Sequence, residues 1–102
     1  MPGNDADALK KRNEELKRIL QDEFGNGVKI RDLHSVETED QDGDPIMRIW
    51  VLYETKDKQL DPDKVASVIG PLRDRIKQLS NGLDRFPILS FRIPKETVLA
   101  AG

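Results

Sequence analysis

The stretch Ile46-Met47-Arg48-Ile49-Trp50-Val51-Leu52-Tyr53 is the strongest strand signal in the chain and decides the fold. Its β-branched and aromatic residues favour extended backbone. Side chains alternate between the two faces of a strand, which divides Ile46–Thr55 into an apolar set and a mixed set. The apolar set is expected to face the core and comprises Met47, Ile49, Val51 and Tyr53. The mixed set is expected to face away from the core and comprises Arg48, Trp50, Leu52 and Glu54.

Two further strands are predicted on either side of this one. Val28–Thr38 alternates in polarity and is separated from Ile46 by the turn Glu-Asp-Gln-Asp-Gly-Asp-Pro at residues 39–45. A short loop rich in Asp and Gly between two strands is typical of a hairpin. The third predicted strand is Phe86–Ile93.

Apolar residues at helical spacing predict two amphipathic helices. The first covers Asp7–Phe24, with an apolar stripe made of Leu9, Leu16, Ile19, Leu20 and Phe24. The second begins at Asp61-Pro62, where Asp caps the helix and Pro occupies its first position, and runs to Leu79. Gly70-Pro71 lies inside it, and since Pro removes a backbone donor we expect a kink or two short helices there.

The element order is therefore α-β-β-α-β in a chain of 102 residues, a length that suits one domain. A strand-helix-strand crossover places its helix on one face of the sheet, and the first helix can lie beside it. We expect an α+β two-layer sandwich with two helices on one face of a three-stranded, mostly antiparallel sheet. We expect residues 7–93 to form this domain, with a disordered segment 1–6 before it and a flexible tail 94–102 after it.

One face of such a sheet stays open and is the predicted interface. The same alternation on the flanking strands places Ser90 and several apolar and basic residues on this face. The predicted interface residues are Arg31, Leu33, Arg48, Trp50, Leu52, Ile88 and Arg92. An apolar patch with a tryptophan and a rim of arginines is typical of a contact surface. The alternatives are that the C-terminal tail covers this face or that a bulge changes the alternation.

Composition excludes several classes of function. Lys and Arg number 17 against 19 Asp and Glu, a net charge of −2 that argues against binding nucleic acid or anionic lipid over the whole surface. Hydrophobic residues make up 36% and charged residues 35%, and there is no cysteine for a disulfide, a thiolate nucleophile or a cysteine zinc site. No signal peptide and no apolar run long enough for a membrane span is visible. We expect a cytoplasmic protein without a cofactor.

No catalytic or metal-binding motif is found. His34 is the only histidine, and on one strand it points away from its neighbour Ser35, so the two cannot form part of a triad. The acidic run of the turn invites comparison with a calcium loop, but aligning Gly43 places Thr38 and Ile49 at ligand positions that require carboxylates. A solvated acidic turn is the preferred interpretation, with a weak metal contact at residues 39–44 left open.

Val68–Leu79 resembles the helix-loop-helix of K-homology RNA-binding domains, whose bacterial form has the order α-β-β-α-α-β. In that family a G-x-x-G loop clamps the nucleic acid backbone. Gly70 matches the first glycine, whereas Arg73 stands where the second belongs and Pro71 removes a backbone donor. The resemblance implies nucleic acid contacts by Gly70, Arg73 and Arg75.

Together these observations favour a non-catalytic interaction or regulatory protein of bacterial type. It is expected to act through its open sheet face, either as a homodimer or with another protein chain. The alternative is a nucleic-acid-binding domain that uses the K-homology-like segment or the arginines of the open face.

Overall fold

The computed structural model describes residues 2–56 and 60–94, with side chains from residue 6 onward. Its elements are α1 (Pro2–Phe24), the 3-10 turn η1 (Gly25–Gly27), β1 (Val28–Glu39), β2 (Pro45–Thr55), α2 (Pro62–Leu79) and β3 (Phe86–Arg92). The predicted order α-β-β-α-β is confirmed. The first helix begins at Pro2 and not at Asp7, so residues 2–6 belong to α1. The predicted tail beyond Pro94 lies outside the described residues.

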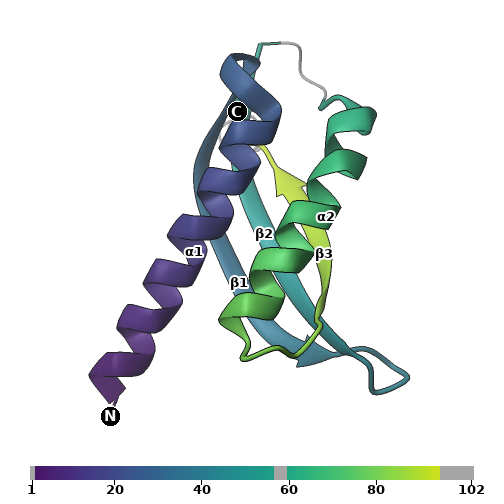
Figure 1. Ribbon diagram of the computed structural model, residues 1–102. Helices are drawn as coiled ribbons and strands as arrows, with labels where there is room; N and C mark the ends of the chain where they lie inside the picture. The colour runs from purple at the N-terminus through teal and green to yellow at the C-terminus, as the bar shows by residue number, and fades with distance from the viewer. Residues whose placement is uncertain (1, 57–59, 95–102) are drawn as a thin grey trace, which may run out of the picture.

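The three strands form one mixed sheet in the order β1-β2-β3. β1 pairs antiparallel with β2, as expected for a hairpin, and β2 pairs parallel with β3 through the α2 crossover. Both helices cover the same face of this sheet (Figure 1). The result is the predicted two-layer α+β architecture, with β2 as the central strand.

The second helix runs through Gly70-Pro71 as one element. Asp61 caps it by accepting the N–H of Asp63 at 2.9 Å, and the helix then continues from Pro62 to Leu79. Of the two forms expected at Gly70-Pro71, the division into two short helices is therefore excluded. Pro71 is exposed and lies on the side of the helix that faces away from the core.

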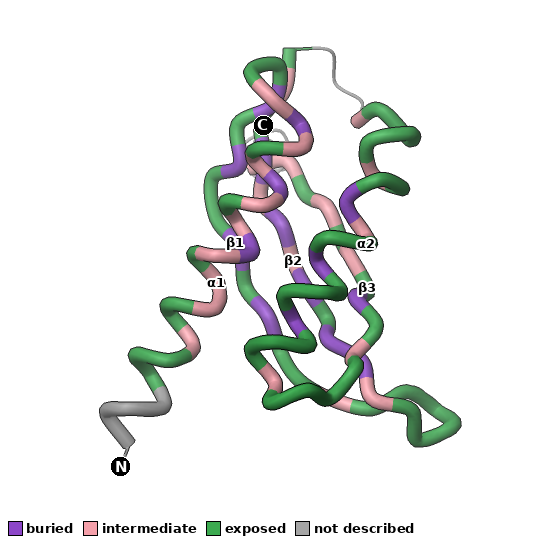
Figure 2. Tube along the Cα trace, viewed as in Figure 1, coloured by how far each residue is buried: buried purple, intermediate pink, exposed green. Residues whose placement is uncertain are grey.

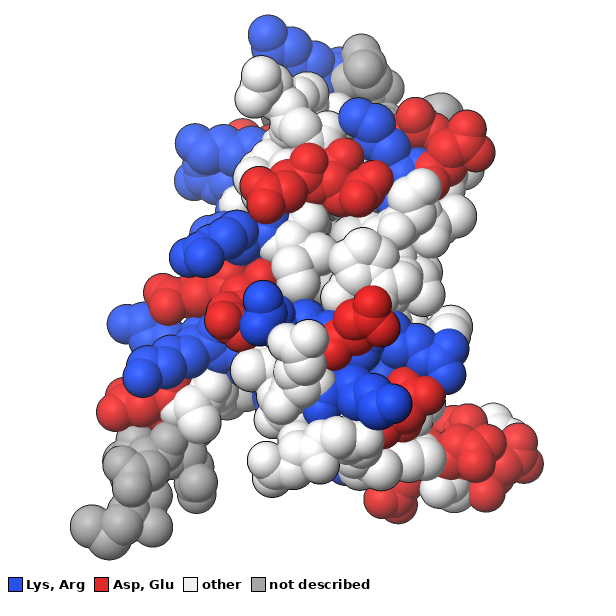
Figure 3. Space-filling view, viewed as in Figure 1, with Lys and Arg blue, Asp and Glu red and all other residues white. Residues whose placement is uncertain are grey.

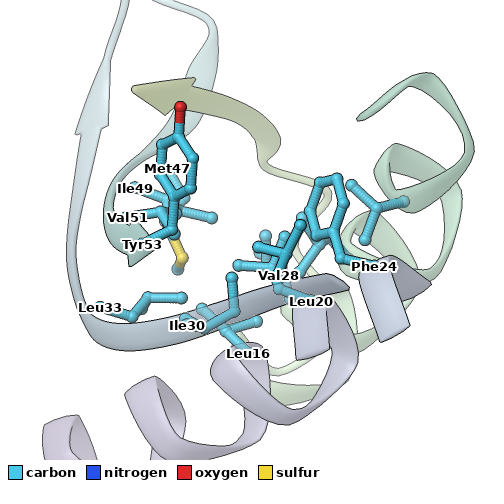
Figure 4. Close-up of a cluster of buried hydrophobic side chains, with 13 residues drawn as sticks. Leu16, Leu20, Phe24, Val28, Ile30, Leu33, Met47, Ile49, Val51 and Tyr53 are labelled. Carbon is cyan, nitrogen blue, oxygen red and sulfur yellow. The ribbon is translucent and has the colours of Figure 1, made fainter. Parts of the chain in front are cut away.

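The core is a single layer between the helices and the sheet (Figures 2 and 4). The predicted inward set of β2 is 0 to 7% exposed and meets two helical stripes of period four. These stripes comprise Leu16, Leu20 and Phe24 from α1, and Val68, Leu72 and Ile76 from α2. Phe91 of β3 closes one end of the core, with edge contacts to Phe24 and Tyr53 at ring-centroid distances of 6.0 and 5.9 Å.

A β-bulge interrupts β1 and changes which of its residues face the core. The register with β2 shifts between Ile30 and Asp32, so an extra residue is inserted into β1. Val28 and Ile30 point inward before the bulge, and Leu33 and Ser35 point inward after it. The alternation therefore moves from even to odd residues within one strand.

Side chains of α1 bind the free edge of β1, the edge away from β2. Gln21 Oε1 accepts a hydrogen bond from the N–H of Ile30 at 2.9 Å, and Gln21 Nε2 donates one to the carbonyl of Val28 at 2.7 Å. At the bulge, Lys17 Nζ donates to the carbonyl of Arg31 at 3.3 Å, and beyond it Arg12 Nη2 donates to the carbonyl of Ser35 at 3.2 Å. Each contact satisfies a backbone group that an edge strand otherwise leaves to solvent.

Over the described residues, neither helix combines length with enough apolar character to cross a membrane.

Candidate functional site

The sheet face opposite the helices is the candidate functional site and is called the open face below. Cross-strand partners share a face of a sheet, so the register assigns its members. Four rows cross β1, β2 and β3 on this face: Asp32–Leu52–Arg92, His34–Trp50–Ser90, Val36–Arg48–Ile88 and Thr38–Ile46–Phe86. Lys29, Arg31 and Glu54 extend the face at one end. In the part of the chain that the structure describes, both helices lie on the other side of the sheet (Figure 1).

The residues predicted for an interface lie on the open face, with the exception of Leu33. Leu33 is 5% exposed and packs in the core. Its predicted placement is wrong because the bulge between Ile30 and Asp32 reverses the alternation of every following residue in β1. On β3 the alternation holds, since Pro87 is buried while Ile88, Ser90 and Arg92 are exposed.

The same bulge brings four residues onto the open face that the sequence pattern missed, namely Asp32, His34, Val36 and Thr38. The sequence contains a signal for it, because the spacing of inward apolar residues changes from two to three between Ile30 and Leu33. The two residues between them, Arg31 and Asp32, are both charged and exposed, which regular alternation in a half-buried strand does not produce.

The centre of the open face is an aromatic pair. The rings of His34 and Trp50 lie 5.6 Å apart between centroids and are inclined by 36°. Trp50 and Leu52 are half-buried, whereas Val36 is 39% and Ile88 36% exposed. A shallow hollow of about 170 Å³ lies between β1 and β3, and its lining includes Asp32 and Arg92. This volume is below the roughly 300 Å³ at which drug-sized ligand pockets begin, so the hollow suits an inserted side chain.

Charges of both signs surround the aromatic pair. The positive side chains are Lys29, Arg31, Arg48 and Arg92, and the negative ones are Asp32 and Glu54. Arg31 Nε lies 3.6 Å from Glu54 Oε2, and both side chains are about half exposed. The helix side also carries both signs along α1 and α2, with carboxylates gathered at the tip of the β1–β2 turn (Figure 3).

A polar cluster on the helix side joins α1 to the end of β1. Arg12 Nε donates to Ser35 Oγ at 3.0 Å, and Ser35 also bonds to the Asn13 side chain. Arg12 Nη1 lies 3.4 Å from Glu37 Oε2. Burial lowers the pKa of Arg12, and the nearby charge of Glu37 opposes that shift. Ser35 and His34 thus point to opposite faces of the sheet, as predicted, and Ser35 serves to hold the helix.

Arg85 belongs to the same cluster and holds the end of the α2–β3 connection against the hairpin. Its Nη1 donates to the carbonyls of Thr38 and Ile46 at 2.9 and 3.1 Å. Its Nε lies 3.9 Å from Glu37 Oε2, and Glu37 also accepts from Ser80 Oγ at 3.4 Å. These bonds tie the hairpin strands to the end of α2 and to the segment that follows it, so the polar groups of the cluster serve the fold.

The acidic turn brings three exposed carboxylates together. One carboxylate oxygen from each of Asp40, Asp42 and Asp44 lies within 4.8 Å of the other two. Asp40 Oδ1 accepts the N–H groups of Asp42 and Asp44, both at 2.9 Å, which is the backbone bonding of an Asx turn. The carboxylate of Asp40 therefore already stabilises the turn itself.

The segment that resembles a K-homology loop lies inside α2. Gly70 and Arg73 occupy consecutive turns of one helix, so no loop separates two helices at this position. Arg73 donates from Nε and Nη2 to the two carboxylate oxygens of Asp84 at 2.8 and 2.6 Å, and its guanidinium lies 5.4 Å from the Phe86 ring centroid. Arg73 is therefore engaged in holding α2 to the start of β3, while Arg75 is exposed beside Gln78.

Compared with models of known protein families, the chain matches none, and a comparison with curated protein sequences gives no significant match either. The functional argument therefore depends on the geometry of the open face.

Proposed function

We propose that this protein is a non-catalytic interaction domain that binds another protein chain through the open face. The observation that carries the proposal is the half-buried pair Trp50 and Leu52 at the centre of a sheet face on which neither helix packs. Tryptophan and arginine are among the residues most enriched at the centres of protein interfaces. Here one tryptophan lies among four basic side chains, two of which, Arg48 and Arg92, belong to the rows on either side of it.

The mechanism would be burial of the apolar centre, with the charged rim determining partner choice. Val36 and Ile88 extend the apolar centre onto both outer strands. Burying them would remove exposed apolar surface from water, the main source of binding free energy. Charges at the rim contribute mainly to orientation and to rejection of wrong partners.

A matched pair of leucine variants tests the proposal. Leu52→Asp places a charge at the centre of the open face, and Leu83→Asp places one at a leucine that is 45% exposed in the α2–β3 connection. We expect a stoichiometric protein partner, or a second copy, to bind the wild type and Leu83→Asp but not Leu52→Asp. Circular dichroism should show the same helical content in all three. A partner that Leu52→Asp retains would contradict the proposal.

A second candidate function is binding of single-stranded nucleic acid, and the His34–Trp50 pair is the observation that favours it. Aromatic and histidine rings on a sheet stack against unpaired bases, and neighbouring arginines contact phosphates. The carboxylates of Asp32 and Glu54 on the same face oppose it. Titration with an oligonucleotide at low salt checks this candidate, because Trp50 is the only tryptophan and its fluorescence reports on this face alone. Unchanged emission would eliminate it.

A further inference from the structure

We propose that the partner of the open face is a second copy of this chain, related by a two-fold axis that runs parallel to β2 between the two sheets. This inference rests on the proposed function and names its partner. It follows from the order of side chains in the rows of the open face. Each row places one residue on each strand, in the order β1, β2, β3.

A two-fold axis parallel to β2 places each row opposite the same row of the copy, with the order of its residues reversed. Residues of β1 then lie opposite residues of β3, and residues of β2 lie opposite themselves. In the first row Asp32 meets Arg92 of the copy, and Arg92 meets its Asp32, which forms two equivalent ion pairs. Leu52 meets Leu52 between these pairs.

The outer residues of the Val36 row and the centre of the Trp50 row also match under this axis. Val36 meets Ile88 of the copy on both sides, so the exposed aliphatic side chains of the outer strands are buried against each other. Trp50 meets Trp50 in the second row.

The like-charged contacts are Glu54 with Glu54 and Arg48 with Arg48. Glu54 lies at the end of β2, where twisted sheets diverge and solvent screens charge. Arg48 lies within a row, but it lines a hollow together with Glu39, Asp40 and Asp42 of the acidic turn, and its long side chain can extend toward those carboxylates and away from the copy.

The other two-fold axis in the plane of the interface, perpendicular to β2, gives a poor match. It reverses each strand onto itself about the Trp50 row. Val36 would then lie opposite Asp32, and Ile88 opposite Arg92. Each exposed aliphatic side chain would meet a charge, which costs free energy because the charge loses water without gaining a partner. The charge pattern therefore favours the axis parallel to β2 over a perpendicular axis through the Trp50 row.

The size of the open face sets the expected strength of the dimer. β3 is 7 residues long. Three strands about 4.8 Å apart, at about 3.3 Å per residue, give a face of roughly 14 by 23 Å. At about 320 Å² on each chain, this face is well below the roughly 800 Å² per partner of a standard specific interface, so we expect weak, reversible association at the upper end of the micromolar range.

Charge reversal provides a test that only this arrangement passes. Asp32→Arg would set a second guanidinium against Arg92 of the copy, and Arg92→Asp would set a second carboxylate against Asp32 of the copy. We expect each variant alone to associate at least about tenfold more weakly than the wild type, because like charges meet at two sites. An equimolar mixture of the two should form a heterodimer with two ion pairs. At one site the two substituted residues pair with each other, and at the other site the unchanged Arg92 of one chain pairs with the unchanged Asp32 of the other. The double variant should form a homodimer again.

Sedimentation equilibrium and the emission of Trp50 measure association in these samples. Asp74→Arg and Arg75→Asp, two exposed reversals on α2, serve as controls and should associate like the wild type. Ile88→Asp is an independent variant in case Asp32→Arg does not fold, and it should also prevent association. Circular dichroism identifies any variant that is unfolded.

The outcomes separate this inference from the proposed function. A wild type that is monomeric throughout the micromolar range, or single reversals that associate normally, would overturn the two-fold dimer. So would a mixture of the reversals that remains monomeric. If the wild type is monomeric but binds a different protein that Leu52→Asp loses, the proposed function stands and only the dimer is wrong.

Discussion

The pair formed by Arg73 and Asp84 shows how one residue holds the α2–β3 connection. Its two short hydrogen bonds lower the pKa of Asp84, and the same contacts raise that of Arg73. A carboxylate with a lowered pKa in the folded state stabilises the fold above its unfolded pKa, and this contribution is lost as the pH falls through the folded value. Stability from Asp84 is therefore present at neutral pH and disappears in acid below about pH 4.

We expect Asp84→Asn to lower the melting temperature at pH 7 and to have little effect in acid, below the folded pKa of Asp84. Thermal unfolding at pH 7 and over a series of acidic pH values, followed by circular dichroism, measures the difference. Asp22→Asn, at an exposed aspartate of α1, is the control and should leave the melting temperature unchanged throughout. A loss for Asp84→Asn that stays the same from pH 7 into acid would show that the carboxylate charge is not responsible.

At the scale of elements, periodicity predicted the helices and strands well because each has a strong apolar pattern. Val68, Leu72 and Ile76 keep their four-residue spacing on the buried side of the helix across Gly70-Pro71. Helix α2 therefore continues where the sequence suggested a break. The face of β1 was harder to predict. A bulge is an extra residue in the backbone of one strand, and here it determines the face of the sheet on which Leu33 and all following residues of β1 lie.

The aromatic pair of the open face illustrates the same limit. Trp50 was placed correctly because β2 has no irregularity, whereas the contact with His34 depends on the register between two strands. A register shift of one residue exchanges the faces of a strand. The candidate site was therefore predictable on β2 and β3, and only the bulged strand altered its membership.

Two glycines should respond in opposite ways to replacement by alanine. Gly70 lies in α2 with no atom within 4 Å of the position a Cβ would occupy, and alanine favours helix by about 1 kcal/mol over glycine. Gly82 follows the helix with φ +90°, where a side chain is strained by about 1 to 2 kcal/mol. Urea denaturation should show Gly70→Ala to be more stable than the wild type and Gly82→Ala less stable. The same sign for both would contradict this assignment of the helix end.

For the whole molecule, the proposed association through the open face would link folding to protein concentration. A dimer that forms only from folded chains raises the melting temperature as concentration increases. We expect this rise in the wild type and its absence in Leu52→Asp, which should melt at one temperature at all concentrations. Scans over a hundredfold range of concentration measure it. A wild-type melting temperature independent of concentration would contradict association through this face.

The contacts of Gln21, Lys17 and Arg12 with the free edge of β1 limit how far such assembly can proceed. An unpaired strand edge can template further strands, and repeated addition leads to aggregates and amyloid-like fibres. Here the α1 side chains already occupy edge groups of Val28, Ile30 and Ser35. A face-to-face pair closed by a two-fold axis has no second copy of that face to offer. In the proposed dimer, association would therefore stop at two chains, which would protect a protein with an exposed sheet against fibre growth from its longest strand.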